Sequence, residues 1–265
     1  MTQVSVRTSA GSGAVLPKDI KPDTILRVDG ATKTFSDGQT KVVALCKAFL
    51  DVPKGKITAV LGPNGSGKST LLGLMSGIIQ PDRRCGKIEY NHPSLGPVEL
   101  STRAGTDMTE VRNCQIATIY QGLNLDKSLT VAENVALPLM LRGIPRGKAL
   151  EAVAGHIRMF GLDGQRAQSY PNRLSGGQQQ RVAICRALVS NAKLILADEP
   201  TARLDSESTK TLMNLLSTMN QKWGTSIVIV THDNSLAKYY CDCYVRCQKG
   251  DYGNTVSTIT KVKKD

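Results

Sequence analysis

One glycine-rich stretch constrains the fold of this chain more than any other feature. Residues 62–70 read G-P-N-G-S-G-K-S-T and satisfy the pattern G-x-x-x-x-G-K-[ST] in full. The apolar run 57–61 before it predicts a buried strand, and residues 68–78 after it predict a helix whose buried face includes Ile78. Glycines let backbone N–H groups turn toward a phosphate, and the helix points its positive N-terminal end at the same anion. The sequence therefore predicts a phosphate-binding strand–loop–helix unit.

Two side chains in this loop have separate expected roles. Lys68 is expected to reach the β- and γ-phosphates of a nucleotide, and Ser69 is expected to bind Mg²⁺. The residues expected to contact the nucleotide here are Gly62, Pro63, Asn64, Gly65, Ser66, Gly67, Lys68, Ser69 and Thr70.

Two adjacent carboxylates follow a second apolar run. Residues 194–197 predict another buried strand, and Asp198 and Glu199 come directly after it. Ligands bind at the carboxyl ends of strands in open α/β sheets. Asp198 is therefore expected to hold Mg²⁺, and Glu199 is expected to polarise the water that attacks the phosphoryl group.

A third segment, residues 174–178 with the sequence L-S-G-G-Q, precedes a helix expected over 179–188. Ser175 is a suitable N-terminal cap and the glycines expose backbone amides, so this helix start also suits an anion. One triphosphate does not need two such sites in one chain. With the three segments together, the chain resembles the ABC ATPase family over residues 25–250. In that family this segment of one subunit closes on the nucleotide held by the other.

The resemblance implies a fold, ligands and partners. The implied fold is α/β, a P-loop NTPase of ABC type with a mainly parallel core sheet, an antiparallel β subdomain and a helical subdomain at about 123–187. It implies ATP and Mg²⁺ as ligands and ATP hydrolysis as the activity. The implied partners are a second ABC ATPase subunit, in a homodimer, and integral membrane permease subunits. The chain would lie peripherally on the cytoplasmic face of the inner or plasma membrane, with no direct contact to nucleic acid.

Further site residues are implied by the resemblance alone. Phe35 matches the aromatic residue that stacks on adenine, and Asp205 matches the loop that crosses the dimer interface. Gln121 matches the glutamine that contacts Mg²⁺ or water and senses the membrane partner, and His232 matches the histidine that contacts the γ-phosphate. The catalytic set is thus Glu199, His232 and Gln121, the metal set is Ser69, Gln121 and Asp198, and the second nucleotide-binding segment is Ser175, Gly176, Gly177 and Gln178.

The remaining pattern divides the chain into a tail and an ordered region. Residues 1–24 are rich in Ser, Thr, Gly and Val without a period, and we predict a flexible tail there. Continuous Ile, Val and Leu runs separated by helical patterns imply a parallel sheet covered on both faces. Residues 251–265 are expected to form a C-terminal strand or tail. Other expected elements are strands at 25–28, 42–45, 48–52 (these two separated by a turn), 87–90, 116–120 and 227–230, a helix at 206–222, and helices over 130–187 with breaks at Pro138, 143–145, Gly161 and Pro171.

Composition excludes some classes of protein. No apolar run reaches the ~18 residues of a membrane span, and the N-terminal residues do not form the apolar core of a secretory signal. Transport would therefore need a separate membrane subunit. The formal charge of +12 admits three interpretations: solubility with affinity for ATP, attraction to an anionic membrane, or binding to nucleic acid.

The seven cysteines are an odd, scattered set, which favours a reducing compartment over a disulfide framework. Cys241, Cys243 and Cys247 lie close together in the sequence. They could be metal ligands, but the spacing is unusual and no fourth ligand is near. We favour small apolar residues on a buried strand and its lead-in.

The segment after the expected strand at 116–120 points to a branch of the family. Residues 120–125 and 129–139 resemble the lipoprotein-releasing and macrolide-export branch, and also FtsE-type division ATPases. In that branch, closure of the ATPase dimer is transmitted across the membrane to a partner. Two alternatives remain: a soluble ABC ATPase acting on nucleic acid or ribosomes, which the charge favours slightly, and a non-transporting regulator of a cell-wall enzyme.

Overall fold

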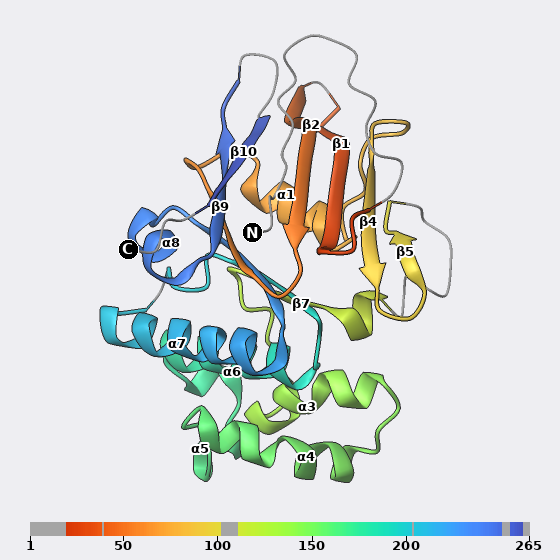
Figure 1. Ribbon diagram of the computed structural model, residues 1–265. Coiled ribbons are helices and arrows are strands. Elements are labelled where there is room, and N and C mark those ends of the chain that lie inside the picture. Colours follow the sequence, from red (N-terminus) through yellow and green to blue (C-terminus); the bar gives the residue numbers. More distant parts are fainter. Residues whose placement is uncertain (1–19, 39, 102–110, 203, 251–254, 262–265) are drawn as a thin grey trace.

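Two β-sheets and a lobe of helices make up the chain in the computed structural model (Figure 1). The structure describes residues 20–38, 40–101, 111–202, 204–250 and 255–261. The predicted tail therefore lies largely outside the described residues. Within the part that is described, Ile20 is buried and the first strand begins at Thr24.

The core sheet has the strand order β10-β9-β3-β8-β7-β6, and all neighbours pair in parallel except β10 with β9. Every residue of β3 and β8 is buried, as their continuous apolar sequences predict. The mainly parallel core sheet is thus confirmed. Its strands are β3 (Ile57–Leu61), β6 (Ile116–Ile119), β7 (Leu194–Asp198), β8 (Ser226–Thr231), β9 (Cys243–Gln248) and β10 (Thr255–Lys261).

The second sheet is antiparallel, with the order β2-β1-β4-β5. Burial alternates strictly along β4, so one face of this sheet packs on the protein and the other does not. The antiparallel β subdomain is confirmed. Its strands are β1 (Thr24–Ser36), β2 (Lys41–Pro53), β4 (Lys87–His92) and β5 (Gly96–Glu99).

The prediction of two strands at 42–45 and 48–52 separated by a turn is wrong, because β2 is one strand. Ala31 pairs with Ala48 and Lys33 pairs with Leu45, which leaves one extra residue on β2. Lys47 takes a positive φ of 46° at this point and its N–H donates to Thr32 Oγ1. The interruption in the apolar pattern therefore marks a β-bulge.

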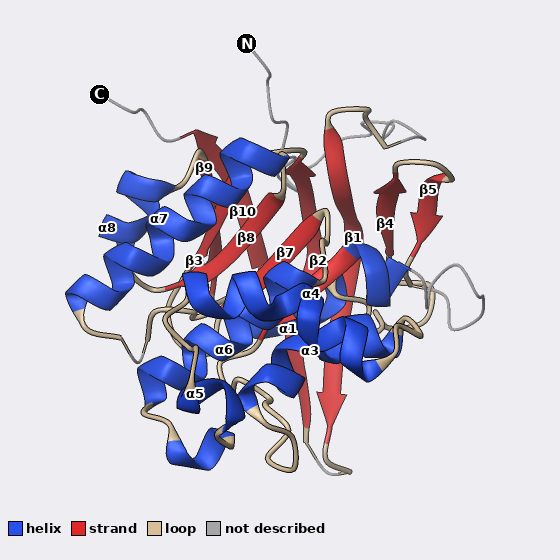
Figure 2. Cartoon of the chain, turned by 90° about the horizontal axis from the view of Figure 1, so that it is seen from below, coloured by secondary structure: helices blue, strands red, loops and turns tan. Residues whose placement is uncertain are grey.

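Two hydrophobic clusters cover opposite faces of the core sheet. Along β3, Ile57, Ala59 and Leu61 join one cluster and Val60 joins the other, as the two-residue period of a strand requires. The first cluster contains residues of α3, α4, α6, α7 and α8, which cover that face (Figure 2). The second contains α1 and the antiparallel sheet, so α1 lies between the two sheets.

The helices outside the lobe are α1 (Lys68–Met75), α7 (Ser206–Trp223) and α8 (Asn234–Tyr240). The prediction that the first of these continues to Ile78 with its side chain buried is wrong. Gly77 takes a φ of 70° and turns the chain out of the helix, which leaves Ile78 61% exposed.

The helical lobe lies together on one side of the core sheet (Figure 1). Pro138 does not break its first helix, contrary to prediction. A capping box at Thr130 fixes the helix start, and burial of Val131 and Val135 outweighs the hydrogen bond that proline cannot make. The lobe contains α3 (Val131–Leu141), α4 (Arg146–Met159), α5 (Gln165–Gln168), a 3₁₀ turn at Pro171–Arg173 and α6 (Gly176–Val189).

Replacing Glu133 should destabilise this lobe in a pH-dependent way. The pKa of Glu133 is lowered by hydrogen bonds from the Thr130 backbone N–H (2.8 Å) and from Arg146 (2.6 Å). At pH 7, Glu133→Ala should lower the free energy of unfolding by about 1 kcal/mol, the usual size of a lost helix cap, in urea titrations. A lowered folded-state pKa stabilises the fold above the ordinary pKa of the carboxyl, and this stabilisation is lost as the pH falls through the folded-state pKa. The matched Glu133→Gln variant keeps the cap and should lose less; equal stability of all three proteins at pH 7 would contradict this role.

Candidate nucleotide-binding site

The predicted site residues converge on the carboxyl edge of the core sheet. The glycine loop follows β3 and leads into α1 at Lys68. Asp198 ends β7, and His232 follows β8, the strand between β3 and β7. Gln121 follows β6, the strand on the other side of β7. Parallel pairing places all these strand ends at one edge, where open α/β sheets bind ligands.

At two positions of the glycine loop, only glycine fits the backbone conformation and the space that is available. Gly67 has a φ of 84°, and a Cβ atom there would lie 2.5 Å from Ala44 O and 2.8 Å from Leu45 Cδ2. Gly62 has a φ of 155°, and its Cβ would lie 2.5 Å from Cys247 O. The loop is therefore packed directly between β2 and β9, with its backbone close to both.

Lys68 forms hydrogen bonds with carbonyl groups of its own loop. Its Nζ donates to Gly62 O and to Pro63 O, at 2.9 Å each, and the residue is only 5% exposed. Ser66 Oγ is buried and makes no hydrogen bond with any described residue. The loop thus carries both a buried cation and an unsatisfied hydroxyl, as a phosphate-binding loop should.

Asp198 lies against the start of α1. Burial raises the pKa of Asp198, while the hydrogen bond with Ser69 and the positive charge of Lys68 lower it in part. A half-buried carboxylate beside a hydroxyl is an incomplete set of the oxygen ligands that Mg²⁺ prefers. Among the described residues no group of three or more His, Cys, Asp or Glu side chains could hold a metal by itself. These oxygens fit a Mg²⁺ ion that is bound together with substrate phosphates.

Of the three predicted catalytic residues, Gln121 and His232 both contact the carboxylate of the third, Glu199. Glu199 Oε1 lies 3.4 Å from His232 Nδ1, and Glu199 Oε2 accepts from Gln121 Nε2 at 3.4 Å. Glu199 has a φ of 46°, and its N–H donates to Val230 O at 2.9 Å. This strained backbone turns the carboxylate out of the line of β7 and toward the residues that follow β6 and β8.

Residues 175–178 form the start of α6, and the cap uses the Gln178 N–H but not those of Gly176 and Gly177. Ser175 and Gln178 make a reciprocal capping box, with Ser175 N donating to Gln178 Oε1 at 2.9 Å. Nothing lies within 4 Å of a Cβ built on Gly176. None of the described hydrogen bonds joins this segment to the glycine loop of the same chain. It borders a groove of about 830 Å³ that also reaches Asp205, the cap of α7.

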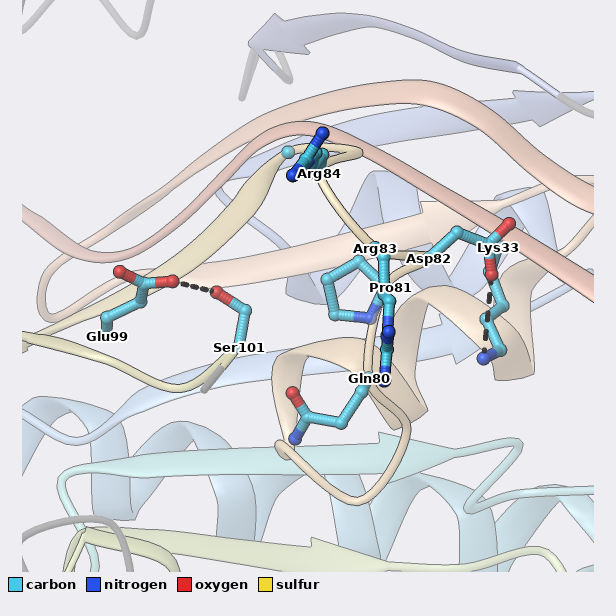
Figure 3. Close-up of a pocket in the computed structure, with 9 residues that line it drawn as sticks. Lys33, Gln80, Pro81, Asp82, Arg83, Arg84, Glu99 and Ser101 are labelled. Atoms are coloured by element: carbon cyan, nitrogen blue, oxygen red, sulfur yellow. Dashed lines mark hydrogen bonds and ion pairs between the residues drawn. The ribbon is translucent and has the colours of Figure 1, made fainter. Parts of the chain in front are cut away.

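The ring of Phe35 is accessible at the end of β1, with 45% of the residue exposed. Lys33 Nζ lies 5.5 Å from the ring centroid and 3.7 Å from Asp82 Oδ1, so the ring has a cation on one side. Figure 3 shows this ion pair at the wall of a separate cavity of about 550 Å³, which Arg83 and Arg84 also line.

The three cysteines near the C-terminal end of the core sheet are buried, as we favoured. Cys241, Cys243 and Cys247 are at most 3% exposed, and burial raises the pKa of the Cys247 thiol to about 12. The sequence does not predict that Cys247 lies beside the glycine loop, because this position results from the pairing of β9 with β3.

The chain matches a family model described as ABC transporter over residues 49–202, more than half of its length. It is 38% identical to the methionine import ATP-binding protein MetN of Escherichia coli K12 over 242 residues, and to MetN 1 of Salmonella typhimurium LT2 over 237 residues. Each match covers 89% of this chain and 66% of the relative, so the chain spans slightly less than two thirds of those proteins. No helix in the described residues is long and apolar enough to cross a membrane.

Solved structures show the same fold. The dimeric bacterial ABC transporter cassette MJ0796 aligns with a TM-score of 0.80 at 31% identity, covering 91% of this chain and 100% of that one. Its post-hydrolysis dimer bound to ADP and Pi gives the same values. CbiO1 from Clostridium perfringens, part of the transporter complex cbiONQ, gives 0.73 at 29% identity, with 91% and 90% covered. The fold, the loop that follows β3 and these similarities together show that the chain belongs to the ABC transporter family.

Proposed function

We propose that this chain is an ATP-binding and ATP-hydrolysing cassette that works as a dimer on a membrane partner. The observation that carries the proposal is the meeting of Gln121, Glu199 and His232 at the sheet edge that also holds the glycine loop. A buried lysine for phosphates and a positioned carboxylate for water are the elements that phosphoryl transfer to water requires.

The roles of the residues follow from their places. Lys68 would exchange its carbonyl partners for the β- and γ-phosphates, which the loop amides from Gly62 to Thr70 also bind. Ser69 and Asp198, with Gln121, would hold Mg²⁺, which neutralises phosphate charge when bound. Glu199 would polarise the attacking water, and His232 would hold the γ-phosphate.

The dimer is proposed because residues 175–178 are prepared for an anion but make no hydrogen bond with the chain's own glycine loop. A second copy of the chain would bring its Ser175, Gly176, Gly177 and Gln178 to the nucleotide, with Asp205 at the shared face. MJ0796 is described as a dimer, which supports this arrangement. Purified chain should hydrolyse ATP, and it should change from monomer to dimer on binding an ATP analogue that it cannot hydrolyse, as sizing with light scattering would show. Absence of both would overturn the proposal.

A groove beside the site fits a membrane partner. It has a volume of about 470 Å³, and Ile78, Leu137, Pro138 and Leu141 give it apolar walls. Arg186 of α6 lines the groove and donates to the carbonyls of Leu123 and Asn124, just after Gln121. A helix docked here would therefore press on the segment that carries Gln121 and on the helix that begins at Ser175.

Leu141→Asp should disrupt this docking without affecting the cassette itself. Leu141 is 72% exposed, so the change should leave folding and basal ATP hydrolysis intact while the charge opposes burial under a partner helix. Pull-down of native membrane subunits should fall at least about tenfold, since burying an unpaired charge costs more than 1.4 kcal/mol. Leu95→Asp, at the similarly exposed tip between β4 and β5, is the matched control. Equal recovery of membrane subunits with both variants would move the docking site elsewhere.

Two classes of transporter are proposed for the whole assembly. The segment at 120–139 supports the lipoprotein-releasing and macrolide-export type, with mechanical transmission across the membrane. The 38% identity with methionine import proteins supports an importer. Purifying the native complex would separate them by the membrane subunits that accompany the chain, and uptake of labelled methionine by vesicles would test import directly. In either case we propose that the chain lies peripherally on the cytoplasmic face of the membrane. Nucleic acid that co-purifies with the chain and dissociates in salt would favour a soluble ABC ATPase instead.

A further inference from the structure

The turn after β9 lies beside the glycine loop. β9 pairs in parallel with β3, and Leu61 is opposite Arg246. The next residues, Gly62 and Cys247, are so close that a Cβ on Gly62 would lie 2.5 Å from Cys247 O and 3.2 Å from Cys247 Cβ. The chain that leaves β9 therefore emerges at the edge of the sheet where the nucleotide is proposed to bind.

Lys249 extends from this turn across the loop. A Cβ built on Gly65 would lie 3.6 Å from Lys249 Cε and 3.7 Å from Lys249 Nζ, so the end of the lysine side chain lies close to the loop at Gly65. Gly65 has a φ of 76°, a backbone conformation that favours glycine at this point of the loop. The ammonium group is thus placed on the loop from a strand that the glycine-loop motif does not include.

The two lysines at the loop differ in their surroundings. Lys68 is buried and is held by Gly62 O and Pro63 O. Lys249 is exposed, and within the described part of the chain it forms no ion pair and no hydrogen bond. A lysine head on a flexible stem can turn toward an anion bound on the loop.

We infer that Lys249 is a second cation that binds the polyphosphate of the nucleotide, from the solvent side of the glycine loop. Lys68 and the loop amides approach the phosphates from within, and Lys249 closes over them from the turn after β9. The inference rests on the proposed ATP binding and adds a substrate-binding residue to it. Because the ammonium is exposed, its contribution should be moderate and should depend on salt.

The test compares the affinities of variants for ATP by isothermal titration calorimetry. Lys249→Ala should weaken ATP binding about 3- to 10-fold at low ionic strength, with a smaller effect at high salt, as a partly screened charge-assisted contact implies. Lys249→Arg keeps the charge and should bind almost as well as the unchanged chain. The effect should be weaker for AMP, which has a single phosphate. Lys54→Ala is the matched control, because Lys54 is an exposed lysine in the turn before β3, at the opposite edge of the sheet.

A second measurement does not depend on any substitution. Acetylation of Lys249 by a water-soluble ester, followed by mass spectrometry, should be slowed by ADP more than by AMP, whereas acetylation of Lys54 should not change. Equal ATP affinity of Lys249→Ala and the unchanged chain, or equal acetylation rates with and without ADP, would overturn the inference. If the unchanged chain bound no ATP, the proposed function itself would fail; if it bound ATP and only the Lys249 effects were missing, this inference alone would fail.

Discussion

Glu199→Gln should abolish ATP turnover and leave ATP binding intact. The amide keeps the size of the side chain and a hydrogen bond to Gln121 or His232, but it cannot polarise water as a carboxylate does. We expect the steady-state rate of phosphate release to fall by about 10²–10⁴-fold, the usual contribution of a general base. The dissociation constant for ATP should change little, since Glu199 is not placed to hold the phosphates.

The same variant should accumulate as an ATP-bound dimer, because hydrolysis is the proposed route to reopening. Size-exclusion chromatography with ATP and Mg²⁺ should show the dimer for Glu199→Gln and mostly monomer for the unchanged chain. Glu151→Gln, on the exposed surface of α4, is the control and should behave like the unchanged chain. Hydrolysis by Glu199→Gln at the normal rate would show that another group activates the water.

Lys68→Ala should remove most of the affinity for nucleotide. The change deletes the buried cation of the loop and leaves Gly62 O and Pro63 O without their donor. A hydrogen bond to a charged group contributes about 1.5–3 kcal/mol, so we expect ATP to bind about 10- to 100-fold more weakly in a calorimetric titration. Hydrolysis at ATP concentrations below saturation should fall in parallel.

The far-ultraviolet circular dichroism of Lys68→Ala should match that of the unchanged chain, which separates loss of binding from loss of folding. Lys68→Arg keeps a cation but has a planar, longer head, and it should recover only part of the affinity. Unchanged ATP affinity of Lys68→Ala would reject the proposed role of this lysine.

The sequence was sufficient to predict the elements whose signals are local. The buried strands β3, β7 and β8 are continuous apolar runs, and the glycine loop is a contiguous motif. Two of the misjudged points depend on tertiary packing: Pro138 is tolerated because its helix is capped and buried, and the gap at Lys47 is a bulge in a strand that β1 continues to pair with. Such compensation is set by neighbours that are distant in the sequence.

The candidate site also combines features that the sequence predicts locally with features that depend on tertiary structure. The individual roles of Lys68, Asp198 and Glu199 were predicted from motifs, but the positive φ of Glu199 has no marker in the sequence. The place of Lys249 could not be predicted either, since it depends on the parallel pairing of β9 with β3. A motif identifies what one segment contributes, whereas strand order decides which other segments reach the ligand.

The close contact of Gly67 with Ala44 and Leu45 has a mechanical consequence. Because a side chain at Gly67 would not fit against β2, we expect β2, the paired β1 that carries Phe35, and the glycine loop to move as one block. Adenine and phosphates would then be gripped by a single body. We therefore expect any rotation during the ATPase cycle to occur elsewhere, with the pivot of the helical lobe at the connection Gln121–Asn124, which Arg186 ties to α6.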